Sequence, residues 1–423
     1  MNHPATVYQH IIAPMLPLLQ KEVDHLKNDN YTLSLKFFTL NLCYAIVACI
    51  GSIRLLITEA KTSDIAISQG IISVSSSMYS EAFNRYDPMI FKRIFFGLLD
   101  KLNFKSIPEI SSLGRFILVD GSIFPAIKSM SWACYKKTAN GIKLHLAFEL
   151  NRMIPVQFFS TDANGSERKM LRELLEEGVT YIADRGYVAF DLFKQITDQS
   201  AFFIIRVKSN MDVVIKKSLT VDLPENWKRH LSDVKDNLIV FKGDNYKKTY
   251  RIITFEALGE VYRIATNRLD LKTHEIIMLY AYRWQIELFF RCFKRCFNGL
   301  HLWSHEAKGI EIQFYLHMIV YLLLMSFKQE IYEKGEALNQ EEKERVDGKE
   351  EQAEVENEII LEKVEKKIPK KNKITRTPAC GIVTLLGEKL KTIWKIGIHW
   401  LVAVKNMLAK PMTNSVIKKL NFH

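Results

Sequence analysis

Hydrophobic positions in the first 110 residues recur at intervals of three and four, which is the spacing of amphipathic helices. The pattern predicts helices at Leu16 to Leu26, Thr32 to Leu56 and Pro88 to Leu102. Asp87 supplies a cap for the last of these, and Pro88 is its first helical residue. Residues 1–110 are therefore predicted to form an N-terminal helical domain. Its end is basic, which suits DNA contact, although a solvated helix face explains any single lysine equally well.

From Arg115 onward the pattern changes to short, continuous apolar runs typical of strands buried on both faces. Two such runs, Phe116 to Val119 and Val179 to Ala183, each precede an aspartate, Asp120 and Asp184. Further strands are predicted at Lys143 to Leu150, Met153 to Thr161 and Ala201 to Val207, with helices at Ser166 to Glu177 and Val188 to Thr197. This order predicts an α/β fold in which helices cover a mixed sheet.

Alternating polar and apolar positions between about 209 and 268 predict a β-rich insertion into this α/β domain, which spans residues 111–332. After it come a helix at Tyr280 to Lys294 and a long helix at about His305 to Tyr332. Residues 333–372 are dense in charge and predict an exposed helix or linker. Residues 373–423 predict a C-terminal helical segment, for which dimerisation is the hypothesis.

The helix from Tyr280 to Lys294 carries one polar stripe on a largely apolar surface. Tyr280, Glu287 and Lys294 are seven residues apart, close to two helical turns, and Arg283 lies on the same face. A solvated, salt-bridged face is one explanation, because Arg283 and Glu287 form an i,i+4 pair. The other explanation is a site that binds phosphate and metal, which needs fixed charges of both signs close together.

Charge favours a polyanionic partner. The chain of 423 residues has a formal net charge of +12, and residues 333–367 hold 13 acidic and 7 basic side chains, so the rest sums to +18. Nucleic acid is the commonest polyanion for such a surface. The two apolar runs, Phe37 to Ile50 and Phe314 to Met325, are shorter than a bilayer span, and no signal peptide is evident. Six scattered cysteines indicate a reducing compartment, so a cytoplasmic protein is expected.

Three carboxylates stand out as candidate metal ligands: Asp120 and Asp184 at strand ends, and Glu287 on the helix. Functional groups in α/β folds gather at the carboxyl ends of strands, so the aspartates meet if their strands are neighbours. Mg²⁺ prefers such oxygen ligands, and two ions can activate a water or a hydroxyl against a phosphodiester. Taken singly, each aspartate before a glycine is also ordinary turn chemistry.

The chain resembles bacterial insertion-sequence transposases of the DDE type, specifically the large family numbered four. Tyr280, Arg283, Glu287 and Lys294 match its signature Y-x2-R-x3-E-x6-K at all four positions. The apolar strand ending in D-R-G-Y is present at Asp184, and Asp120 stands in the first motif as LVDGS. The resemblance covers about Arg115 to Tyr332.

This resemblance implies an RNase H-like catalytic core interrupted by the β insertion, in which Asp120, Asp184 and Glu287 bind two Mg²⁺ or Mn²⁺ ions. It implies cut-and-paste transposition by a homodimer acting on terminal inverted repeats and target DNA, in the nucleoid of a bacterium. Tyr280, Arg283 and Lys294 are then expected to contact DNA phosphates. Candidate additional DNA contacts are Arg185, Lys208 and Trp227, the last either stacking on a flipped base or simply packing in the insertion.

Two alternatives remain open at this stage. One is an RNase H-like nuclease that cuts DNA without joining it, and the other is a non-catalytic, domesticated DNA-binding protein. All three carboxylates are present, which argues against decay of the catalytic site.

Overall fold

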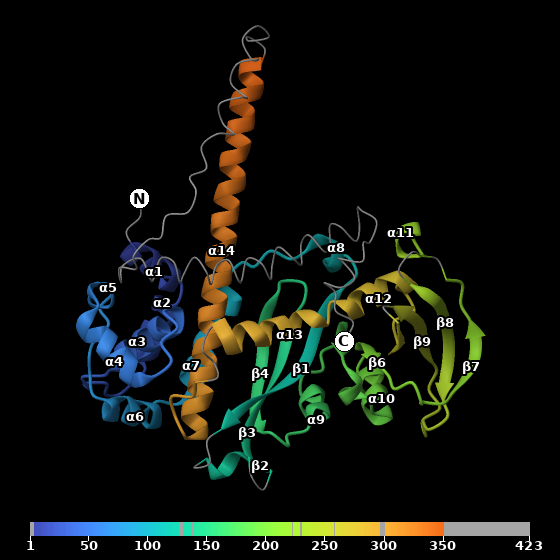
Figure 1. The fold of residues 1–423 in the computed structure, drawn as a ribbon, viewed down its shortest axis with the longest axis horizontal. Coiled ribbons are helices and arrows are strands. Elements are labelled where there is room, and N and C mark those ends of the chain that lie inside the picture. Colours follow the sequence, from blue (N-terminus) through green and yellow to red (C-terminus); the bar gives the residue numbers. More distant parts are fainter. Residues whose placement is uncertain are drawn as a thin grey trace.

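The computed structural model describes residues 4–126, 130–136, 139–221, 223–228, 231–257, 259–296 and 301–350. Figure 1 shows a block of N-terminal helices on one side of a long helix, α14 (Ala307–Glu350), and a large sheet on the other. The predicted C-terminal segment at 373–423 lies outside the described residues, as do residues 351–372 of the charged stretch. Residues 333–350 continue α14, so the start of that stretch is helical.

The N-terminal region is helical, as predicted. Its helices are α1 (Pro4–Ile12), α2 (Leu16–Asp24), α3 (Leu35–Val47), α4 (Ile53–Thr62), α5 (Asp64–Ser68), α6 (Ser76–Arg85), α7 (Pro88–Lys101) and α8 (Pro108–Ser111). The prediction of one helix from Thr32 to Leu56 is wrong, because Cys49 adopts a φ of 56° and Ser52 caps a new helix by accepting from the Leu55 amide. The Asp87 cap of α7 is confirmed, since its Oδ1 accepts from the Met89 amide at 2.9 Å.

The described strands form one mixed sheet. They are β1 (Arg115–Ala126), β2 (Cys134–Lys136), β3 (Ala139–Glu149), β4 (Ile154–Asp162), β5 (Val179–Ala183), β6 (Phe202–Arg206), β7 (Val213–Ser218), β8 (Ser232–Phe241), β9 (Tyr250–Ala257) and β10 (Glu260–Thr266). Strands β1, β5 and β6 are parallel neighbours, while β3 and β4 continue the sheet antiparallel from β1. The five strands predicted for the α/β region are thus confirmed, and the arrangement is consistent with an RNase H-like fold.

The insertion is β-rich, as predicted, and its strands extend the same sheet. Strand β10 pairs antiparallel with β6, and β9, β8 and β7 follow in order to the far edge. Figure 1 shows them at the end of the molecule opposite the N-terminal helices. The insertion is therefore hydrogen-bonded to β6. Strand β6 lies beside β5, and Asp184 follows β5 directly.

A buried ion pair ties this insertion to helix α12 (Thr273–Ala281). The Arg251 guanidinium on β9 donates to both Asp236 oxygens, at 2.9 and 2.6 Å, and to the Leu271 carbonyl at 2.6 Å. The Thr273 hydroxyl donates to Asp236 at 2.7 Å. These contacts set the position at which α12 begins.

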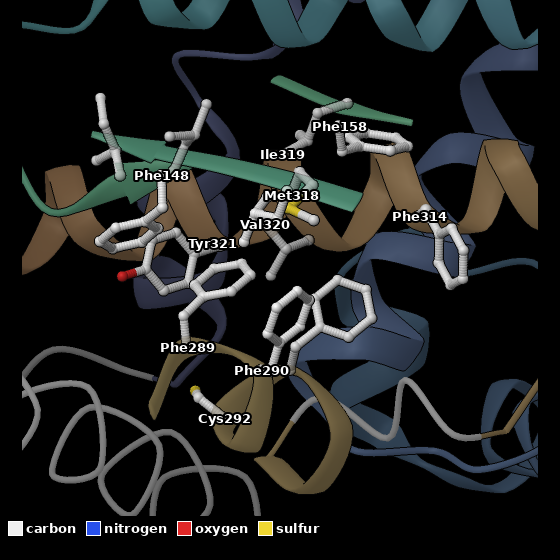
Figure 2. Close-up of a cluster of buried hydrophobic side chains, with 14 of the residues drawn as sticks. Phe148, Phe158, Phe289, Phe290, Cys292, Phe314, Met318, Ile319, Val320 and Tyr321 are labelled. Carbon is white, nitrogen blue, oxygen red and sulfur yellow. The ribbon is translucent and has the colours of Figure 1, made fainter. Parts of the chain in front are cut away.

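Alternating residues of β1 face two different cores. Ile117 and Val119 pack under α9 (Glu167–Arg172) and α10 (Phe190–Asp198), which are shorter than the helices predicted there. Phe116 and Leu118 face α13 (Trp284–Arg291) and α14 on the opposite side. Figure 2 shows this second core, where Phe289 of α13 meets Phe148 of β3 and Tyr321 of α14 at ring distances of 5.3 and 4.9 Å. Aromatic packing therefore fixes α13 across the face that includes Asp120.

The first part of α14 is the central helix of that core. Its segment Ala307–Glu330 is apolar and long enough to cross a membrane, longer than the run predicted at Phe314 to Met325. Of its most apolar window, 78% is buried inside the protein. Its neighbours are aromatic residues of α7, β4 and α13. These contacts identify it as a core helix.

Candidate active site

Asp120 and Asp184 lie on neighbouring parallel strands. The pairing of β1 with β5 runs from Arg115 opposite Val179 to Leu118 opposite Ile182, and continuing it by two residues sets Asp120 beside Asp184. Asp184 directly follows β5, as predicted. Asp120 was expected at a strand end but lies inside β1, because antiparallel pairing with β3 carries that strand on to Ala126. The parallel pairing with β5 stops at Leu118, two residues before Asp120.

The prediction of one continuous helix from Tyr280 to Lys294 is wrong. Helix α12 ends at Ala281, α13 begins at Trp284, and Cys292–Cys296 form a π-helix. Three backbone hydrogen bonds of the tighter i to i−3 type close the turn between α12 and α13. In each of them an amide N–H donates to the carbonyl three residues earlier, and the acceptors are Tyr280, Tyr282 and Arg283. The helix is thus divided at Arg283, inside the polar stripe.

Arg283 and Glu287 form the ion pair expected from their spacing. The Arg283 Nη2 donates to Glu287 Oε1 at 2.6 Å, and Arg283 is only 7% exposed. Burial disfavours the charge of Arg283, but Tyr280 and Glu287 outweigh it, so the pKa of the guanidinium is raised. Arg283 is therefore a fixed positive charge beside the carboxylates.

The three candidate carboxylates share one electrostatic environment. Burial raises the pKa of Asp120 to about 7, and the negative charges of Asp184 and Glu287 add to that rise. Arg283 and the Gly121 amide, which donates to Asp120 Oδ1 at 2.8 Å, act in the opposite direction. A half-buried carboxyl whose neighbours are two further carboxylates gains from a cation.

The donor chemistry of this site suits a hard divalent cation. All three groups are carboxylates, the ligands that Mg²⁺ and Mn²⁺ take in proteins. Among the described residues, no group of three Asp, Glu, His or Cys side chains is close enough to hold one ion as the side chains stand. In this arrangement Glu287 is paired with Arg283 at 2.6 Å.

The other two stripe residues also lie at the site. Lys294 Nζ donates to the Ile123 carbonyl of β1 at 2.8 Å and lies 4.7 Å from the centre of the Phe124 ring. Burial lowers the pKa of Lys294, while Asp120 counteracts it. Tyr280 is 4% exposed, and burial raises its pKa against the effect of Arg283. The four positions are therefore brought around Asp120 despite the break in the helix.

Residues 111–323 match the model of the protein family described as "Transposase DDE domain". The chain belongs to this family. The matched region of the DDE domain begins just before β1 and ends within α14, so it contains Asp120, Asp184 and Glu287.

Relatives of this DDE domain are bacterial proteins named as transposases. The y4zB protein of Sinorhizobium fredii is 29% identical over 49% of this chain and 59% of its own length. A protein named for the insertion sequence IS5377 of Geobacillus stearothermophilus is 25% identical over 56% of this chain and 62% of its own length. A protein named for IS4SA of a Synechocystis species is 25% identical over 60% of this chain and 71% of its own length. The chain thus spans about three fifths of the first two relatives.

Among solved structures, an endonuclease V from Bacillus subtilis matches 47% of this chain and 84% of its own chain. The sequence identity is 14% and the TM-score is 0.22. A score this low carries no argument about function.

The remaining predicted DNA contacts of the DDE domain fall into two groups. Arg185 and Lys208 are exposed, at the ends of β5 and β6 respectively. Trp227, in α11 (Glu225–Lys228), is 2% exposed and packs against His274 of α12, with the rings 6.1 Å apart. Its burial favours the packing role over stacking on a flipped base.

Two charged residues near the candidate site were not singled out from the sequence. The pairing of β5 with β6 reaches Ala183 opposite Ile205, so the next step puts Arg206 beside Asp184. Arg206 stacks 4.2 Å from the Tyr262 ring centre and pairs with Glu260 at 3.3 Å. The second residue is Glu167, at the start of α9. Strand register would have indicated Arg206, whereas no spacing in the sequence indicates Glu167.

Asp120→Asn is expected to stabilise the metal-free DDE domain at neutral pH. Because the folded-state pKa of Asp120 is about 7 against an ordinary 3.8, the folded state keeps a proton that the unfolded chain releases. Stability is therefore lost as pH rises from about 4 to 7, by up to roughly 4 kcal/mol. Urea denaturation in EDTA at pH 5 and pH 8 measures this. An equal pH dependence in wild type and Asp120→Asn would contradict the prediction.

Proposed function

We propose that this chain is a cut-and-paste DNA transposase that cleaves the ends of its element and joins the freed 3′ ends to target DNA. The observation that carries the proposal is that Asp120 and Asp184 lie on neighbouring strands within electrostatic range of Glu287 and Arg283, in a transposase DDE domain. Relatives named for insertion sequences support it. On the spacing of Tyr280, Arg283, Glu287 and Lys294 we assign the chain to the family numbered four.

The three carboxylates are proposed to bind two Mg²⁺ or Mn²⁺ ions. Such ions supply an activated water or 3′-hydroxyl and stabilise the leaving oxygen of a phosphodiester. The chain supplies Asp120 and Asp184 from adjacent strands and Glu287 from α13. The packing of Phe289 and Phe293 on β1, β3 and α14 holds Glu287 on the face where Asp120 lies.

The Arg283 to Glu287 ion pair is proposed to be the DNA-free arrangement of the site. A DNA phosphate offers Arg283 a charged acceptor for its planar donors, and Glu287 is then released toward the aspartates. Tyr280 and Lys294 add a hydroxyl and an ammonium group on the same side, and the exposed Arg185 and Lys208 extend the positive surface. In this proposal the polar stripe is a salt-bridged surface without DNA and a phosphate- and metal-binding site with DNA.

The partners follow from the proposed reaction. We propose that a homodimer pairs two double-stranded ends, the terminal inverted repeats, and then captures target DNA. The site of action would be the bacterial cytoplasm at the nucleoid. The surplus of 18 positive charges outside residues 333–367 supports a DNA partner.

The test of the proposal is an end-cleavage and joining reaction with Mg²⁺. The DNA carries the sequences that flank the coding region, and a supercoiled plasmid serves as target. Joined products are expected. Cleavage without joining would instead support the nuclease alternative, and metal-independent binding without turnover would support the domesticated protein.

Lys294→Gln is expected to weaken DNA binding uniformly across sequences and to reduce the slope of log Kd against log salt by about one, because one phosphate contact releases about one counterion. Fluorescence anisotropy between 50 and 200 mM salt would measure the slope. Lys194→Gln is the matched control, since Asp198 already pairs with that lysine. An unchanged slope for Lys294→Gln would remove Lys294 from the interface.

A further inference from the structure

Glu167 lies against the loop that carries Asp184. It is the first residue of α9, where the Ser166 hydroxyl accepts from the Lys169 amide. The next residue, Arg168, donates from Nε to the Gly186 carbonyl at 3.0 Å. The start of α9 is therefore attached to the turn that follows β5.

The Glu167 carboxylate lies between two glycines, and each glycine follows a candidate catalytic aspartate. A Cβ added to Gly121 would come within 3.0 Å of Glu167 Oε1, and one added to Gly186 would come within 2.9 Å of Oε2. A side chain at either position would therefore displace the Glu167 carboxylate, so glycine at both positions leaves the space that the carboxylate occupies. The same added Cβ at Gly186 would lie 3.0 Å from Asp184 Oδ1, so both acidic side chains lie against Gly186.

Glu167 is also paired with a lysine, Lys143. Lys143 Nζ of β3 is 3.3 Å from Glu167 Oε1 and donates to the Gly165 carbonyl at 3.2 Å. Both side chains are partly buried, at 14% and 26% exposure. Two functions are compatible with this pair. It can simply stabilise the fold, or it can partly neutralise a carboxylate whose charge acts on the aspartates.

Tyr187 is a buried group on which Glu167 and the two aspartates all act electrostatically. This buried tyrosine follows Gly186, and burial raises its pKa well above the ordinary value. The negative charges of Asp120, Glu167 and Asp184 add to that rise, and Arg283 opposes it. Glu167 is therefore within electrostatic range of the same buried group as both candidate metal ligands, so its removal alters the field in which they work.

We propose that Glu167 is a positioning residue of the active site, which holds the turns of Asp120 and Asp184 at their spacing and strengthens divalent-cation binding by its charge. The proposal rests on the proposed function, because it presumes that Asp120 and Asp184 bind the cations. A residue that orients metal ligands without being one of them typically changes metal affinity by about 10- to 100-fold.

Calorimetric titration of the full chain with MnCl₂, without DNA, tests the proposal. Glu167→Gln is expected to weaken Mn²⁺ binding by about tenfold or more. Lys143→Met, which breaks the same ion pair but keeps the negative charge, is expected to bind Mn²⁺ at least as tightly as wild type. Equal weakening by both variants would mean that only the ion pair matters, and it would overturn the proposal.

Two further variants keep the test decisive. Asp120→Asn is the reference for loss of a direct ligand. If it weakens Mn²⁺ binding while Glu167→Gln does not, the inference about Glu167 fails and the proposed function stands. If neither weakens binding, the proposed metal site fails with it. Gly121→Ala, which displaces the Glu167 carboxylate without removing any acid, should also weaken binding.

Discussion

Glu287→Gln should reduce DNA cleavage at element ends by at least about a thousandfold, while DNA binding persists. The amide has nearly the volume of the carboxylate, so the packing of α13 is preserved, but it carries no charge with which to bind a cation. Arg283, which pairs with Glu287 at 2.6 Å, keeps its charge for phosphate. Cleavage of labelled end DNA with Mg²⁺, measured beside an anisotropy titration, separates the two effects.

A matched control for this substitution is Glu177→Gln, which changes an exposed glutamate between α9 and β5. It should cleave at the wild-type rate. Undiminished cleavage by Glu287→Gln would remove Glu287 from the catalytic site. Loss of both binding and cleavage would instead indicate that the Arg283 to Glu287 pair is needed for the fold of the turn between α12 and α13.

Arg251→Met should lower the free energy of unfolding by about 3 to 5 kcal/mol. Arg251 and Asp236 are buried, with side-chain exposures of 5% and 0%, so removal of the arginine leaves a charged carboxylate without its main partner. The carbonyl of Leu271 also loses its 2.6 Å donor. Chemical denaturation monitored by circular dichroism measures the change.

The matched control breaks a surface ion pair of similar type. Lys228 and Glu225 are 54% and 84% exposed, and Lys228→Met should cost less than about 1 kcal/mol. If Arg251→Met costs no more than this, the buried pair does not hold the insertion to α12. Adding Asp236→Leu to Arg251→Met should recover part of the loss, because the unpaired buried charge is then gone.

Local patterns in the sequence were sufficient for most strands and for the two aspartates. Continuous apolar runs predicted β1 and β5, because buried strands need apolar side chains on both faces. Each run is followed directly by an aspartate. The spacing of Tyr280, Arg283, Glu287 and Lys294 likewise predicted that one surface carries these side chains. Such signals depend on neighbours in the chain, and they are readable without long-range contacts.

Contacts between distant segments decided the rest. The division of the helix at Arg283, the burial of Trp227 on α12 and the place of Arg206 beside Asp184 depend on how strands and helices pack. Glu167 is the clearest case, since it meets Gly121 and Gly186 only because α9 folds back over two parallel strands. The sequence by itself indicated which residues are candidates for the chemistry of a DDE site. Only the tertiary structure decided which charges surround them, because electrostatic interactions depend on distance in space and not on separation along the chain.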